Sequence, residues 1–233
     1  MSRVANGIAA LPSSPHPKGH CEGCTAGKMC VMKYARTSGS VVKSSAVLDL
    51  VHGAIMGPKK VKSKAGARFV FVLVDDWSRF ITVYILKRKG EAFTKFKEYK
   101  RFMETPLGRR IKCFRTDNGG EVCSKRYRAF LASHGIQHQI SAPYSPQQNG
   151  TAERANRSLS ESARASLPYQ VWSPEWWGEA VVNAAYTLSR QPNAARGDST
   201  PFEVMWGSRP SVKHKRVFEA WICLRGSIKA QQV

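Results

Sequence analysis

The chain has 233 residues, 42% of them hydrophobic, which suits one good-sized domain with a buried core and short flanking segments. Its 37 lysine and arginine residues outnumber 16 aspartate and glutamate residues, giving a formal net charge of +21. This surplus indicates a polyanionic partner such as nucleic acid, and a merely basic ribosomal or secreted protein is the alternative. The longest apolar run, 69–74, is too short for a membrane span, so we expect no membrane partner.

We expect no globular structure in the first forty or so residues. Residues 1–20 are rich in Ser, Pro and Gly, and we expect a disordered leader there. Cys21 and Cys24 follow with the spacing of half a zinc site, but a structural Zn²⁺ needs four ligands. We therefore expect 21–44 to be the remnant of a zinc-binding segment and a linker. Cys113 lies in an apolar run and is expected in the core, and a reducing intracellular compartment is the expected location.

Apolar and β-branched runs alternate with helical patterns along the rest of the chain. The predicted strands are 45–52, 67–74, 80–86, 111–116 and 137–141. The predicted helices cover 91–103, 124–133, 151–167, 173–190 and a short segment after Thr200. Ser124, Ser173 and Thr200 are expected N-caps, and a polar turn is expected at 75–78.

This order of elements predicts an α/β domain of the ribonuclease-H-like class. We expect a five-stranded mixed sheet flanked by helices, with extra C-terminal helices. The predicted core covers 45–192, and 193–233 would form a C-terminal helix and tail.

Two carboxylates stand out in a chain with so few acids. Asp117 follows a predicted strand, and Glu153 lies in the first turn of a predicted helix. Two-metal phosphoryl transfer needs carboxylates from separate elements that converge on two cations about 4 Å apart, and Mg²⁺ accepts such oxygen ligands. Each residue also has a plain structural interpretation, because Asp117 stands in a turn-forming Asp-Asn-Gly-Gly segment and Glu153 complements a helix dipole.

Several longer segments match one known family. They are DNGGE, HGIQHQISAPYSPQQNGTAER, WWGEAVVNAAYTLSR, TPFEVMWGSRP, HKRVF, VHGAIMGP, ARFVFVLVDDWSRFITVYILK and CEGCTAGK. In these segments the chain resembles the integrase core of copia-type retrotransposons, over roughly residues 21–220. The resemblance implies an Asp, Asp, Glu triad that uses Mg²⁺ or Mn²⁺ to trim DNA 3′ ends and join them to target DNA. It makes Asp117 the second member of that triad and Glu153 the third.

The first triad position departs from the family pattern. The family has His-x-Asp-x-x-Gly-Pro there, and this chain has HGAIMGP with Ala54 in place of the Asp. Asp49 would face the other side of a regular strand, and Asp75 and Asp76 are expected in a turn at the far end from Ala54. We therefore expect an integrase core with weak or lost chemistry. A non-catalytic DNA-binding protein with the same fold is the main alternative, and a cellular ribonuclease-H-like nuclease is a third.

Polar and basic side chains near these positions are candidate DNA contacts. They are Gln147, Gln148 and Asn149 in a loop, Asn156, Arg157 and Ser160 on the Glu153 helix, and Lys59, Lys60, Lys62 and Lys64 between the first two strands. Solvated surface side chains are the alternative for the basic ones. Backbone contacts of this kind tolerate any sequence and weaken with salt. The expected partners are element ends, target DNA and further copies of the chain, with nuclear location when the target is chromosomal.

Overall fold

The computed structural model describes residues 44–116, 124–140, 150–169, 173–192 and 198–214, and it contains one five-stranded mixed sheet. The strands are β1 (Leu50–Met56), β2 (Phe69–Asp75), β3 (Ile81–Leu86), β4 (Cys113–Thr116) and β5 (Gln137–Ile140). Their order in the sheet is β3-β2-β1-β4-β5. The first three strands are antiparallel neighbours, and β4 and β5 run parallel to β1. This confirms the predicted five-stranded mixed sheet.

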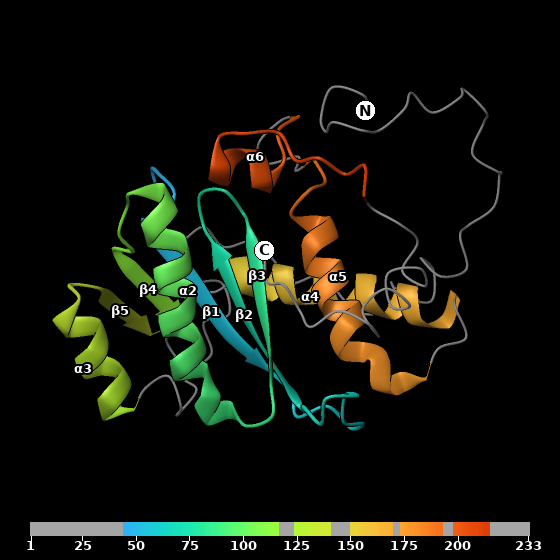
Figure 1. Cartoon of the computed structure of the whole chain (residues 1–233). Coiled ribbons are helices and arrows are strands. Elements are labelled where there is room, and N and C mark those ends of the chain that lie inside the picture. Colours follow the sequence, from blue (N-terminus) through green and yellow to red (C-terminus); the bar gives the residue numbers. More distant parts are fainter. Residues whose placement is uncertain (1–43, 117–123, 141–149, 170–172, 193–197, 215–233) are drawn as a thin grey trace, which may run out of the picture.

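Helices cover both faces of the sheet, as Figure 1 shows. The helices are α2 (Ala92–Leu107), α3 (Lys125–Ser133), α4 (Gly150–Tyr169), α5 (Trp177–Leu188) and α6 (Pro201–Trp206), with short 3₁₀ turns η1 (Lys89–Glu91) and η3 (Pro174–Trp176). Alternate residues of a strand point to opposite faces. Phe71 and Leu73 of β2 accordingly pack with α2 and α3, whereas Val72 and Val74 pack with α4 and α5. None of the described helices is long and apolar enough to cross a lipid bilayer.

Aromatic packing fills the face covered by α2 and α3. The ring centroids of Phe96 and Phe114 lie 4.4 Å apart, and the Phe114 ring stacks on Tyr127 at 5.9 Å. On the other face α4 and α5 meet through small side chains, among them Ala155, Ala163, Ala180 and Ala184. Small residues let the two helices approach closely, which places the start of α4 directly over the sheet. Cys113 is buried, as predicted.

Two predicted boundaries are wrong, for local reasons. The strand predicted at 45–52 begins only at Leu50, because the Asp49 carboxylate accepts hydrogen bonds from the backbone of Ser45 and Ala46 and turns the chain there. The strand then continues past Ala54 to Met56. The helix predicted at 91–103 continues to Leu107 and ends at Gly108, whose φ of 60° suits glycine.

The caps predicted at Ser124 and Thr200 are confirmed, whereas Ser173 precedes the 3₁₀ turn η3 without a side-chain capping bond. The Ser124 hydroxyl accepts a hydrogen bond from the backbone N–H of Tyr127, and the Thr200 hydroxyl accepts one from Glu203. These bonds satisfy backbone donors that the first turn of a helix leaves without partners.

Gly53 tests how tightly β1 packs against the aromatic face. A Cβ at this position would lie 2.6 Å from Cζ of Phe114, a fully buried ring that stacks on Tyr127 and cannot move aside. We expect Gly53→Ala to lower the free energy of unfolding by about 1–3 kcal/mol, measured by urea denaturation. Gly90→Ala is the matched control, because a Cβ there meets nothing within 4 Å. Equal effects of the two substitutions would contradict this packing.

Candidate active site

Ala54 lies at the centre of β1 and is 7% exposed. Its side chain shares a face of the strand with His52 and Met56, the face that α4 covers. The parallel register with β4 pairs Gly53 with Thr116, the residue immediately before Asp117 in the sequence. Asp117 itself lies outside the described residues, so its predicted catalytic role stays a prediction.

Helix α4 lies over β1 from His52 to Met56. Thr151 in the first turn shares the Asp76 carboxylate with His52, and Oγ of Ser160 lies 3.9 Å from Sδ of Met56. Nine helical residues rise about 13.5 Å, and four strand residues span about 13 Å. The middle of this part of the helix, at Asn156, therefore lies over the middle of the strand, at Ala54.

The side chains of α4 divide into buried and exposed ones as the helix turns. Ala152, Ala155 and Leu159 are buried against the sheet, and Glu153 and Arg157 are exposed. Asn156 and Ser160 are half-buried, so four predicted site residues share one flank of α4 but lie at different depths. The buried Oδ1 of Asn156 has no hydrogen-bond partner among the described residues. An orphaned oxygen of this kind suits a donor from a bound water or ligand.

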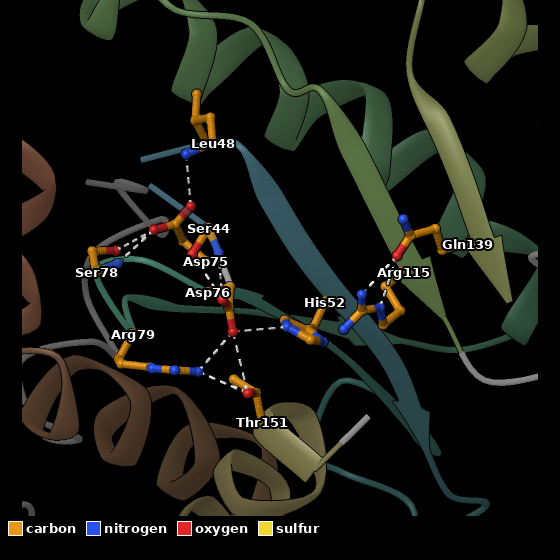
Figure 2. A network of polar contacts seen from close by, with 10 residues as sticks. All are labelled: Ser44, Leu48, His52, Asp75, Asp76, Ser78, Arg79, Arg115, Gln139 and Thr151. Atoms are coloured by element: carbon orange, nitrogen blue, oxygen red, sulfur yellow. Dashed lines mark hydrogen bonds and ion pairs between the residues drawn. The ribbon is translucent and has the colours of Figure 1, made fainter. Parts of the chain in front are cut away.

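A polar network holds the first turn of α4 to the sheet (Figure 2). Asp76, 12% exposed, accepts hydrogen bonds from Nε2 of His52 at 3.1 Å, from the Ser44 hydroxyl at 2.7 Å and from Arg79 at 2.9 Å. Arg79 also donates to the Thr151 hydroxyl at 2.7 Å, and that hydroxyl donates to Asp76 at 3.3 Å. The expected separation of Asp76 from the site is therefore only half right. Its turn lies beyond His52, but its side chain reaches a residue two positions before Glu153.

Hydrogen-bond donors and a nearby positive charge keep the Asp76 carboxylate ionised. Burial alone would raise the pKa of its carboxyl. The hydrogen bonds from His52 and Ser44 and the positive charge of Arg79 outweigh burial and hold this pKa well below its usual value. The carboxylate is thus occupied by cationic and hydroxyl partners, so it is poorly suited to replace the missing triad acid.

The other two nearby acids are also occupied. Asp75 is fully buried and accepts hydrogen bonds from the backbone N–H groups of Leu48 and Ser78, and burial raises the pKa of its carboxyl. Asp49 pairs with Lys112 at 2.7 Å, and this contact is the main reason that its pKa falls to about 2. Both side chains stabilise the turns that flank β1.

The described residues around Ala54 fit a pair of divalent cations poorly. Ala54 offers a methyl group where a carboxylate ligand would stand. On β4 the buried Arg115 pairs in register with His52, two residues before Ala54, and its guanidinium donates to the Gln139 side chain at 2.7 and 3.0 Å. Among the described residues no three His, Cys, Asp or Glu side chains gather where they could hold a metal. Glu153 is the described carboxylate at the start of α4, and it is exposed.

The predicted basic hairpin lies between β1 and β2, as expected. Lys60, Lys62 and Lys64 are exposed, and Lys64 pairs with Glu175 at 3.7 Å. Lys59 is half-buried, and burial followed by the nearby charge of Arg164 lowers the pKa of its ammonium group. Since Arg164 belongs to α4, the hairpin and the Glu153 helix contribute to one basic region.

The remaining predicted site residues lie outside the described part of the chain. They are Cys21 and Cys24 of the predicted zinc remnant and Gln147, Gln148 and Asn149 of the loop before α4. Their roles stay predictions. Four residues of the polar network and its surroundings were not predicted from the sequence: Arg79, Thr151, His52 and Arg115. The Asp-x-x-Arg spacing at 76–79 is a signal for an ion pair.

Known proteins match the chain over most of its length. Residues 43–146 match the family described as integrase core domain. The Pol polyprotein of transposon TNT 1-94 from Nicotiana tabacum is 35% identical over 198 residues, which make up 85% of this chain and 15% of that polyprotein. The Pol polyprotein of transposon RE1 from Arabidopsis thaliana is 26% identical over 217 residues, 93% of this chain and 14% of that polyprotein. The chain thus spans about one seventh of the polyproteins that it matches.

Solved structures match the fold. A chain of the simian T-cell lymphotropic virus intasome, solved with the PP2A regulatory subunit B56 gamma, has a TM-score of 0.61 and 20% identity, covering 81% of this chain and 64% of that one. The HTLV-2 integrase catalytic core domain, solved with magnesium in trimeric and dimeric forms, has a TM-score of 0.53 and 19% identity. That match covers 69% of this chain and 98% of the viral domain. The predicted ribonuclease-H-like fold is confirmed.

The Asp76 network predicts a pH-dependent stability. An acid whose folded-state pKa is lowered stabilises the protein above its unfolded pKa of about 3.9, and this contribution is lost as the pH falls toward the folded-state pKa. We expect Asp76→Asn to lower the free energy of unfolding by about 1.5–3 kcal/mol at pH 7, and by less at pH 3. Urea denaturation at both pH values measures this. Asp198→Asn, an exposed control, should change little, and an equal loss for Asp76→Asn at both pH values would refute the charged network.

Proposed function

Because the chain contains an integrase core domain and is homologous to Pol polyproteins of plant copia-type retrotransposons, we propose that it is an integrase core that binds DNA and whose strand-joining chemistry is impaired. The substrates would be element ends and target DNA, bound by one or more copies of the chain in the nucleus. The proposed impairment rests on one observation: Ala54, buried on β1 beneath α4, occupies the position of the first acid.

Charge and side-chain placement support DNA binding. The chain has a net charge of +21, and the hairpin lysines and α4 contribute to one basic region. Arg157 is exposed and has no hydrogen bond or ion pair with any described residue, so its guanidinium is free to contact a phosphate. Contacts of this kind fix a protein on the DNA backbone without reading the sequence.

The surroundings of Ala54 support impaired chemistry. Two-metal phosphoryl transfer depends on carboxylates that bridge the cations and balance their charge. Replacing one carboxylate by a methyl group removes a ligand and a negative charge, and the buried Arg115 adds a positive charge on the same face of the sheet. A non-catalytic DNA-binding protein is the second candidate, and the burial of a methyl group at Ala54 favours it.

Restoring the acid distinguishes the two candidates. We expect the unmodified chain to show no measurable Mg²⁺- or Mn²⁺-dependent strand transfer, because the first carboxylate is absent. Ala54→Asp should gain such activity if the rest of the site is intact. Ala54→Asn should gain none, because asparagine has the size of aspartate without its charge. Gel assays of strand transfer and disintegration on labelled element-end duplexes measure this.

A second readout accompanies that assay, since Ala54→Asp also buries a charge. Binding of Mn²⁺ to the folded state should raise the melting temperature of Ala54→Asp and leave that of Ala54→Asn unchanged. Robust activity in the unmodified chain would overturn the proposed impairment. A folded Ala54→Asp variant with neither activity nor metal binding would establish the non-catalytic candidate.

DNA binding itself is tested by its salt dependence. We expect the chain to bind duplex DNA of any sequence, with an affinity that falls linearly on a log–log plot against salt. Arg157→Gln should reduce the magnitude of that slope by about 0.7–0.9, the effect of losing one phosphate contact. Fluorescence anisotropy measures both quantities. Arg101→Gln, an exposed change on α2 across the sheet, is the control, and a wild-type chain without DNA binding would contradict the proposed function.

A further inference from the structure

A cavity of about 390 Å³ lies beside the first turns of α4. The β2–β3 turn, the end of α5 and the first residue of α6 form its other walls. Successive helical residues turn by 100°, so Arg154 and Ser158 face this cavity whereas Asn156 and Ser160 face the opposite flank of α4. The cavity is therefore separate from the Ala54 site. It is of the size class, about 300–1,000 Å³, that binds small ligands.

Unpaired polar groups form part of the lining of the cavity. The Arg154 guanidinium, the Ser158 hydroxyl and the Gln191 amide make no hydrogen bond or ion pair with any described residue. Arg79 also lines the cavity, but Asp76 and Thr151 already hold it in place. Arg154 thus supplies a positive charge that no described carboxylate pairs with, beside hydroxyl and amide groups that can bind an anion.

The other walls of the cavity are apolar. Ile81, Leu188 and Pro192 contribute hydrocarbon surface to the same lining. A carboxylate from an acidic peptide would use Arg154 and leave this surface uncovered. A nucleotide has both required parts, because its phosphate is anionic and its sugar and base offer flat, weakly polar surface.

We propose that this cavity binds one unpaired nucleotide at the end of a DNA strand, with its phosphate on Arg154 and its sugar or base against Ile81, Leu188 and Pro192. The inference rests on the proposed DNA binding and deepens it. Arg154 and Arg157 are three residues apart on α4 and therefore neighbours on its outer surface. A strand bound at Arg157 can continue to Arg154 and place its next nucleotide in the cavity. A paired base inside a duplex is stacked and cannot enter, which makes the site selective for an unpaired one.

The test compares two DNA ligands by fluorescence anisotropy, a blunt duplex and the same duplex with two unpaired nucleotides at one end. We expect wild type to bind the frayed duplex at least about 5-fold more tightly, the effect of burying one sugar or base against aliphatic side chains. Arg154→Gln and Ser158→Phe should abolish that preference, the first by removing the charge and the second by filling the cavity. Arg157→Gln should weaken binding to both duplexes equally.

Methyl NMR spectra of the full chain locate the nucleotide. Thymidine 5′-monophosphate should shift the methyl signals of Ile81 and Leu188 in wild type and not in Arg154→Gln. Both Arg154 and Ser158 are exposed, so melting temperatures should stay close to wild type.

Three outcomes overturn the inference. If wild type binds the two duplexes equally, the inference about the cavity is refuted and the proposed DNA binding is retained. A glutamate-rich peptide that shifts the same methyl signals more strongly than the nucleotide assigns the cavity to a protein partner instead. Failure of wild type to bind even the blunt duplex removes the proposed function and the inference together.

Discussion

The central strands β1 and β2 are covered by helices on both faces, and this double burial is the constraint on which the rest of the structure depends. Any polar group on such strands loses water and must find a partner inside the protein. Asp75 meets Ser78, Thr116 meets His138, and Arg115 meets Gln139. The buried polar side chains of β1, β2 and β4 therefore have hydrogen-bond partners, and the candidate site lies where His52 meets the start of α4 through Asp76.

The contact between Asp76 and the start of α4 connects the hairpin turn to the functional helix. Small and apolar side chains such as Ala155 and Leu159 form the stripe of α4 that faces the sheet. The charged hydrogen-bond network is directional and fixes the position of the first turn of α4 beside the β2–β3 turn. The same arrangement separates two surfaces, one with Asn156 over Ala54 and one with Arg154 at the cavity.

Local chemistry made much of the fold predictable from the sequence. The periodic apolar runs placed all five strands, and Ser124 and Thr200 capped their helices as expected. The start of β1 could not be predicted, because Asp49 competes for backbone donors that an extended strand would use elsewhere. The link between Asp76 and Thr151 joins residues 75 positions apart, so no local pattern contains it. The cavity likewise needs four separate segments of the chain to form its walls.

Helix α6 has a consequence for how the polypeptide can be cut. Its Met205 lies in the main core, and its Trp206 ring packs edge-on against Phe80 of the β2–β3 connection at 6.1 Å and against Phe102 of α2 at 6.0 Å. A protease that cleaved just after α5 would strip this cover and leave aromatic surface exposed to solvent. Such a shortened fragment would be prone to aggregate. Recombinant fragments should therefore extend beyond Trp206.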